Sequence, residues 1–371
     1  MLFIKKCDIM IKRNLSCINI ALLKRKKSKK EVNILKTIFS IRHTNILKGC
    51  AVILLLFHHL FYKLEFFENC FVFCQLDMIV CNKFAQYSKV CVALFLILSG
   101  YGLTVSANKR LEPITWKYSF EHIVKLMINF WVIYLLFVPL GLIFGRNPIE
   151  IYGTGVNGIY NFLVDFFGVA HLFNTPTFNA TWWFMGEILR LYILFPLLYS
   201  CVKNNKILLL GLGVVMCFFY DNLVWFLPFI CGMLIAEKDY FSWYINLKGS
   251  KKCMIILAFF AFVLIRPIFA VKIDTMFALG IITFILLFIK PESIFGRVFE
   301  VLGKHSGNLF MFHTFIYAYY FKDFIYGFYH PVIILLILLI VCLVISWTIE
   351  RSKHILRLNK VQGLLFEHKK M

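Results

Sequence analysis

The chain has 371 residues, of which 61% are hydrophobic and only 16% are charged, against roughly 25% charged in an ordinary soluble domain. A mean hydropathy of +0.79 and apolar runs of up to 20 residues exclude a soluble enzyme, a disordered chain and a small disulfide scaffold, because only a bilayer can solvate such runs. The sequence therefore predicts an all-α integral membrane protein, a polytopic helix bundle.

About ten stretches are predicted to cross the membrane. In chain order they are 45–64, 85–106, 121–145, 183–202, 206–220, 223–237, 253–271, 273–289, 303–321 and 331–349. The fifth and sixth are short for a hydrocarbon core of ~30 Å. No internal repeat is evident, so we expect one membrane domain at 42–352 between basic cytoplasmic tails at 1–41 and 353–371.

The net charge of +21 comes from 40 Lys and Arg against 19 Asp and Glu. If the N-terminus is cytoplasmic, the cytoplasmic segments hold 30 of these basic residues and the segments on the other side hold 5. This is the positive-inside bias, which predicts that both termini are cytoplasmic. The basic run at 24–27 is typical of a juxtamembrane segment, so we expect no nucleic-acid partner.

Twelve cysteines are scattered along the chain, mostly within apolar stretches, where cysteine behaves as a small hydrophobic residue. Cys70, Cys74 and Cys81 fall in one loop and can pair there, but no additional Cys or His supplies the spacing of a zinc site. We expect no metal.

The first stretch carries three basic side chains, Lys48, His58 and His59. Ionisable groups at membrane depth are costly and are therefore candidates for function. Eleven residues separate Lys48 from His59, which places both on one helix face about 16 Å apart along the axis. The alternatives are that Lys48 reaches the headgroups and that the histidines anchor the helix at the interface.

The fourth stretch carries Glu187 near its outer boundary and Arg190 three residues later. These two side chains share a helix face, so one interpretation is an ion pair within the helix. The other is that Glu187 accepts a hydrogen bond from the ring of His59, which lies at a similar predicted depth, and holds the imidazole as a base.

Weaker candidates lie in other stretches. Ser99 precedes a glycine in mid-span, where close helix packing is an alternative role. His313 lies near the midplane and can instead be a satisfied core histidine. Lys125 lies at an inner mouth, where it can hold an anionic ligand or simply follow the positive-inside rule. Trp182 and Trp183 can stack on sugar rings or belong to an aromatic belt.

Five segments occur in an order that resembles a known family. They are LKGCAVILLLFHH at 47–59, FLILSGYGLT at 95–104, WWFMGEILRLYILFPLLY at 182–199, LGKHSGNLFMFH at 302–313 and SWTIER at 346–351. Together they resemble acyltransferase family 3, the membrane O-acyltransferases of bacterial surface glycans. Lys48 stands where arginine is commoner in the family, which keeps the charge but loses the bidentate geometry of a guanidinium.

The resemblance implies a ten-span protein of the inner (plasma) membrane that transfers an acetyl group from cytoplasmic acetyl-CoA to a glycan or lipid-linked saccharide. Glycan assembly or export proteins are the implied partners. The implied site residues are His59 and Glu187 for catalysis, Lys48, Ser99, Lys125 and His313 for the donor, and Trp182, Trp183 and Tyr192 for the acceptor.

Two alternatives from other classes stay open at this point. A transporter or exporter can use the same intramembrane ionisable residues as a proton or substrate pathway. A structural subunit of an export complex needs none of them for chemistry. Only the enzyme is expected to release coenzyme A from acetyl-CoA, so measuring this release distinguishes it from a transporter and from a structural subunit.

Overall fold

The computed structural model describes residues 39–67, 75–245 and 249–356. Within these ranges all the regular elements are helical, which confirms the all-α prediction. The α-helices are α2 (Ile41–Phe61), α3 (Gln75–Ser88), α4 (Cys91–Asn108), α5 (Trp116–Leu140), α6 (Pro148–Tyr152), α7 (Gly155–Phe166), α8 (Trp183–Asn204), α9 (Lys206–Phe219), α10 (Phe226–Lys238), α11 (Tyr240–Ile245), α12 (Gly249–Phe269), α13 (Asp274–Phe288), α14 (Ile294–Lys304), α15 (Ser306–Thr314), α16 (Lys322–Tyr326) and α17 (Pro331–Ile355).

Short helical turns join several of these helices. They include the 3₁₀ turns η2 (Ala170–Phe173), η3 (Ala180–Trp182), η4 (Asp221–Leu223) and η5 (Ala270–Ile273), and the π-helical segment η6 (Phe315–Tyr320).

Six helical stretches are long and apolar enough to cross a bilayer, which makes this a multi-pass membrane protein. They are Ile41–Phe61, Met78–Asn108, Trp116–Leu140, Ala180–Asn204, Cys253–Phe288 and Pro331–Ile355. The fifth stretch contains α12 and α13, which η5 joins and which pack against each other. The expected spans at 206–220 and 223–237 correspond to α9 and α10, which have only 14 and 13 residues.

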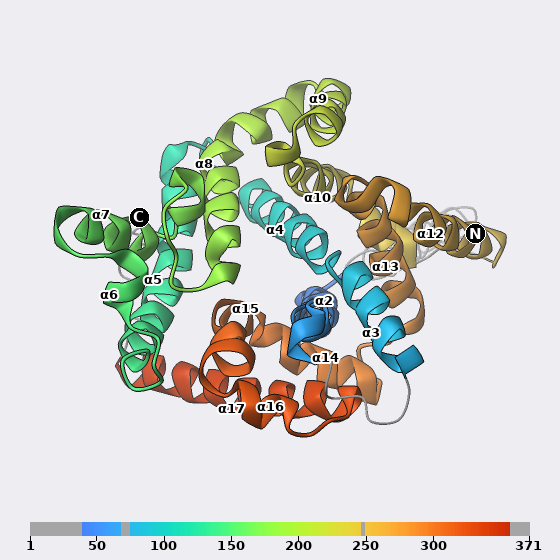
Figure 1. The fold of residues 1–371 in the computed structure, drawn as a ribbon. Coiled ribbons are helices and arrows are strands. Elements are labelled where there is room, and N and C mark those ends of the chain that lie inside the picture. Colours follow the sequence, from blue (N-terminus) through green and yellow to red (C-terminus); the bar gives the residue numbers. More distant parts are fainter. Residues whose placement is uncertain (1–38, 68–74, 246–248, 357–371) are drawn as a thin grey trace, which may run out of the picture.

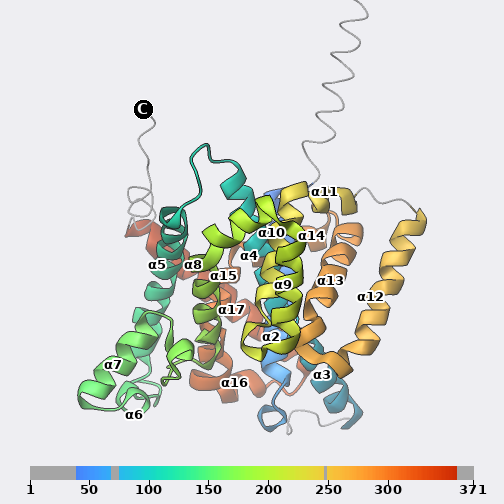
Figure 2. The same ribbon diagram turned by 90° about the horizontal axis from the view of Figure 1, so that it is seen from above.

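Figure 1 shows α2 near the centre of the bundle, with the other helices arranged around it. In Figure 2 the short helices α3, α6, α7 and α16 lie at one end of the bundle, and α11 lies at the other. The start of α2 and the end of α17 share the end that carries α11. We call this end the terminal side and the other the distal side.

Glycines bring α2 and α14 into close backbone contact. A Cβ placed on Gly49 of α2 would lie 2.0 Å from the backbone oxygen of Phe299 in α14, and one on Gly303 would lie 1.8 Å from that of Asn45. Only hydrogen fits at such distances, so the two backbones are locked together. This contact fixes the position of Lys48, which precedes Gly49, relative to α14.

The long connection between α5 and α8 is held by a buried carboxylate. Asp165 accepts hydrogen bonds from the Tyr152 hydroxyl at 2.7 Å, the Thr177 hydroxyl at 2.8 Å and the Phe178 amide at 2.8 Å. Burial raises the pKa of this carboxyl. Arg146 donates to the Phe178 carbonyl at 2.8 Å from the other side. The connection is therefore an ordered part of the distal side.

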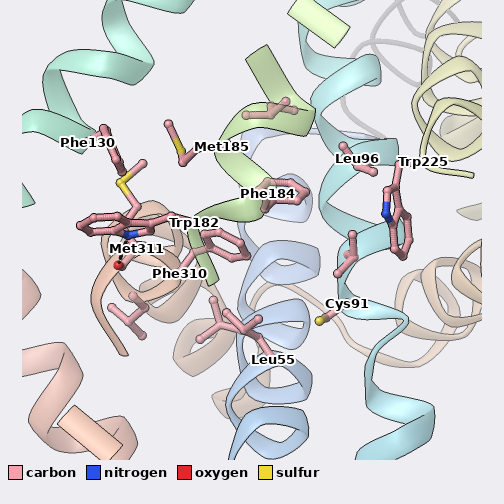
Figure 3. Packing of buried hydrophobic residues seen from close by; sticks show 14 of the residues in the cluster. Leu55, Cys91, Leu96, Phe130, Trp182, Phe184, Met185, Trp225, Phe310 and Met311 are labelled. Carbon is pink, nitrogen blue, oxygen red and sulfur yellow. Dashed lines mark hydrogen bonds between the residues drawn. The ribbon is translucent and has the colours of Figure 1, made fainter. Parts of the chain in front are cut away.

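Aromatic and aliphatic side chains from α2, α4, α8 and α15 form the centre of the core (Figure 3). The rings of Phe184 and Phe310 lie 4.7 Å apart. Trp182 is only 2% exposed, and its indole nitrogen donates to the Met311 carbonyl at 2.8 Å. This packing joins the segment around Trp182 to α15.

The closing helix extends past the boundary at 352 that the sequence suggested. α17 continues to Ile355, and Lys353, which we placed in a basic tail, is 3% exposed within the bundle. The rest of both predicted tails, 1–38 and 357–371, lies outside the described residues, as do Cys70 and Cys74.

Candidate active site

Two histidines from distant parts of the chain face each other in the bundle. The ring of His59 in α2 lies 4.9 Å from the ring of His313 in α15, and Tyr317 of η6 stacks on His313 at 5.9 Å, centroid to centroid. His313 is fully buried, whereas His59 is partly exposed. We call His59 and His313 the histidine pair.

The hydrogen bonds of His313 indicate which of its two ring nitrogens carries the hydrogen. Nδ1 lies 2.9 Å from the Leu309 carbonyl and 3.1 Å from the Phe310 carbonyl. Because both partners are acceptors, Nδ1 carries the hydrogen and Nε2 is an acceptor in the neutral ring, with the Thr314 hydroxyl 3.5 Å away. The α-helix changes to the π-helix η6 directly after Thr314, a distortion that is frequent at functional sites.

His58 is held differently from its neighbour. Its Nδ1 donates to the backbone carbonyl of Ala85 in α3 at 2.7 Å, and the side chain is buried. This bond ties α2 to α3. His59 is therefore the histidine of the two whose ring lies against that of His313.

Glu187 does not contact His59. Its carboxylate is bonded to Arg190 on the same helix, which is the ion-pair interpretation. Arg190 also donates to the Asn222 carbonyl at 2.8 Å and lies over the ring of Phe226. The carboxylate is therefore already bonded within its own helix, and the structure shows no hydrogen bond between Glu187 and His59.

Glu187 instead lines a cavity on the distal side. The cavity has a volume of about 420 Å³, in the range of small-molecule pockets. We call it the tryptophan cavity, because Trp183 and Trp225 lie in its wall with ring centroids 5.8 Å apart. The other lining residues are Lys89, His171, Leu172, Asn174, Glu187, Arg190, Asp221 and Asn222.

Lys89 lies between the helices that carry the tryptophan cavity and His59. It lies in the turn between α3 and α4 and lines the cavity. It is also close enough to interact electrostatically with His59. Lys89, His171 and Trp225 all fall outside the segments that resemble the family, so no motif pointed to them.

The predicted acceptor residues separate into three environments. Trp183 lines the tryptophan cavity, as an acceptor contact requires. Trp182 is buried and bonded to Met311, so it packs in the core and cannot stack on a sugar. Tyr192 is a hydrogen-bond partner of Ser99, which joins α8 to α4. Sequence reasoning treated Ser99 and Tyr192 as parts of different sites.

The predicted donor cations lie toward the terminal side. Lys48 is partly buried on α2, and within the described residues its ammonium group has no hydrogen bond or ion pair. Lys125 of α5 is exposed. The donor roles of both remain predictions.

A buried polar cluster on α15 and α17 was not among the predicted site residues. Asn308 donates to Ser346 at 3.0 Å and to Glu350 at 2.8 Å, and His305 bonds to Ser346 at 2.9 Å. Lys353 donates to Glu350 at 2.6 Å, and it also donates to Asn308 and to Asn129 of α5. We call His305, Asn308, Ser346, Glu350 and Lys353 the terminal cluster. Two of the five family-like segments carry all of these residues except Lys353, which is the signal that could have found the cluster.

No group of three or more Cys, His, Asp or Glu side chains suited to a metal ion occurs in the described ranges.

Comparison with known proteins gives one match. The model of a family described as an acyltransferase domain matches residues 44–351. Searches of curated proteins and of solved structures found no match. The match spans all five motif segments and most of the chain, and it favours an enzyme over a transporter. The chain therefore belongs to acyltransferase family 3 and is a membrane acyltransferase.

Proposed function

We propose that this acyltransferase moves an acetyl group from acetyl-CoA in the cytoplasm to a hydroxyl of a saccharide on the other side of the inner membrane. In this proposal the terminal side is cytoplasmic, and the chain crosses the membrane ten times, counting α9, α10 and the α14–η6 segment. The 30-to-5 distribution of basic residues supports this orientation.

The observation that carries the proposal is the histidine pair. His59 is partly exposed, and its ring faces His313, which has an unprotonated Nε2. If one nitrogen of His59 donates to Nε2 of His313, the other nitrogen is free to act as a base. His313 then orients the ring of His59, a role that the sequence analysis assigned to Glu187.

The chemistry is one acyl transfer. His59 takes the proton from a sugar hydroxyl as the oxygen attacks the thioester carbonyl. The carbon–sulfur bond breaks, and the coenzyme A thiolate takes the proton from the imidazolium. General base catalysis of this kind contributes ~10²–10⁴ in rate.

The two substrates would approach His59 from opposite sides. Lys48 lies eleven residues before His59, about 16 Å along α2, and would hold a phosphate of the donor, assisted by Lys125. The extended pantetheine arm of coenzyme A is long enough to cover roughly this distance.

The acceptor would occupy the tryptophan cavity. Trp183 and Trp225 offer apolar faces to a sugar ring, and Glu187, Arg190 and Asn222 offer hydrogen-bonding groups. This mixture of aromatic faces and polar groups is typical of small-ligand sites. Such an acceptor would be delivered by glycan assembly or export proteins, and we propose no role for nucleic acid.

The test is a sided transfer assay. The protein is reconstituted in proteoliposomes. Acetyl-CoA labelled in the acetyl group is supplied to one face of the membrane only, and an oligosaccharide acceptor is supplied only to the opposite face. We expect labelled saccharide on the distal side and free coenzyme A on the donor side. Transport of saccharide without release of coenzyme A would contradict the proposal.

A further inference from the structure

A second cavity lies at the other end of α8, on the terminal side. It has a volume of about 660 Å³ and is bounded by the end of α8, the start of α9, the end of α10 and the start of α11. Three lysines line it, Lys203, Lys206 and Lys238. We call it the lysine cavity. Lys203 is sixteen residues from Glu187 on the same helix, about 24 Å along the axis, so the two cavities are separate.

The lysines outnumber the carboxylates that could neutralise them. Glu237 is shared, with Lys203 at 2.6 Å and Lys206 at 3.6 Å. Asp239, the next acidic residue, accepts a hydrogen bond from Ser242. Lys238 forms no ion pair within the part of the chain that the structure describes. The cavity is therefore positively charged and suited to an anion.

The wall beside these cations is apolar and faces outward. Ile207 and Leu208, at the start of α9, are 89% and 70% exposed, and Leu208 lines the cavity together with Leu210. Figure 1 shows α9 at the rim of the bundle, away from the central α2 that carries Lys48 and His59. A ligand here meets lipid on one side and cations on the other.

The length of α9 favours a lipid as the ligand. Its 14 residues extend about 21 Å, whereas the hydrocarbon core is ~30 Å thick. A short helix is accommodated by local thinning of the bilayer or by flanking basic side chains that reach the headgroups. At the terminal end of α9 this draws headgroups toward Lys206.

We propose that the lysine cavity binds an anionic phospholipid of the adjacent leaflet. Lys206 and Lys238 hold the phosphate, and the acyl chains run along Ile207 and Leu208. Basic pockets between transmembrane helices bind anionic headgroups in this way. Lys203 stays bonded to Glu237 and to Asn108 of α4, at 3.0 Å, and supports the wall.

The test measures binding of a fluorescent phosphatidylglycerol to detergent-purified protein, in competition with unlabelled phosphatidylglycerol or phosphatidylcholine. We expect Lys206→Gln and Lys238→Gln each to weaken binding about fivefold, and phosphatidylcholine to compete poorly. The matched controls are Lys109→Gln and Lys117→Gln, each tested alone, at two exposed lysines near the same end. Each removes one charge, as each test variant does, and should leave binding unchanged.

Two results would overturn the proposal. Equal loss in the control variants would assign the binding to diffuse surface charge. Displacement of the lipid by coenzyme A alone would make the cavity a nucleotide site. The second result would also question Lys48 as the donor contact, but acyl transfer itself is measured separately in the sided assay, so failure of the lipid proposal and failure of the proposed function are distinguishable. Thermal unfolding of each variant shows whether it is folded.

Discussion

The histidine pair and the terminal cluster are both buried polar sites that involve α15, but they differ in how completely their groups are bonded. In the terminal cluster, Lys353 has three partners, and Asn308 joins Ser346 to Glu350. In the histidine pair, His59 faces His313 and keeps part of its surface exposed. Polar groups that bond one another stabilise a fold, whereas His59 has no hydrogen bond to another described residue and is the group of the two sites that a substrate could bond. We therefore expect the terminal cluster to support the fold and His59 to take part in the reaction.

The largest expected effect tests the reactive side of this comparison. His59→Ala should reduce acetyl transfer by ~10²–10⁴, because the base is lost. The amount of the His59→Ala protein in the membrane should not change. The measurement is transfer of labelled acetyl, with protein quantified in the same membranes. The neighbour supplies the control: His58→Ala loses the bond to Ala85 but should keep transfer activity. Equal inactivation of both variants would contradict a specific role for His59.

For the terminal cluster we predict a loss of stability when a member is replaced. Lys353→Met should cost about 1 kcal/mol, because Asn129 and Asn308 lose a donor. Glu350, by contrast, is 44% exposed, and water replaces its lost ion pair. The midpoint of thermal unfolding should fall, while turnover per folded molecule should stay the same. Lys304→Met, which removes an exposed partner of Glu300, should have little effect. A Lys353 variant with normal stability and lost turnover would place the terminal cluster in the reaction.

Lys48 lies outside both sites and tests whether an unpaired cation marks a ligand contact. Lys48→Gln should raise the KM for acetyl-CoA about tenfold, the effect of one charge-assisted hydrogen bond, with kcat unchanged. Lys48→Arg should retain most of the affinity. The check is a titration of acetyl-CoA at saturating acceptor. An unaltered donor dependence would remove Lys48 from the donor site.

His313 tests whether the second member of the histidine pair positions the first. His313→Gln should lower kcat by up to about tenfold, the cost of one orienting hydrogen bond. The pH profile of kcat/KM should also shift, because the ring beside the base is gone. A purely structural role would lower stability and leave the profile unchanged. Transfer rates measured across pH decide between the two.

Glu187 should show the smallest effect, because its carboxylate is already bonded to Arg190. Glu187→Gln keeps the shape of the side chain and should change the KM for the saccharide by only about fivefold, without altering the pH profile. If it instead abolished transfer or changed the profile, a direct interaction with His59 during turnover would follow, as the sequence suggested.

The sequence predicted the helical bundle and most of its elements, because apolar runs and charge spacing are local properties. It also placed His59 on the same helix face as Lys48, since that follows from helix geometry alone. The partner of His59 depends on how α2 packs against α15, which no local pattern encodes. Glu187 looked equally suitable by depth, but Arg190 three residues later held its carboxylate.

The two tryptophans illustrate the same limit. Trp182 and Trp183 are adjacent in sequence, yet one packs in the core and the other lines a cavity. The 3₁₀ turn η3 ends at Trp182 and α8 begins at Trp183, so neighbouring side chains point in different directions. Periodicity cannot decide which of them reaches a ligand.

The backbone contact of Gly49 with Phe299 has a consequence for substrate selection. In the proposed reaction Lys48 holds the donor phosphate and His59 acts at the thioester, and both belong to α2, which its close contact with α14 holds in place. The helix itself would then set the distance between the two positions, and a thioester on a truncated carrier, such as N-acetylcysteamine, would not reach both. Thus the enzyme would discriminate by the reach of the carrier, independently of the size of the acyl group.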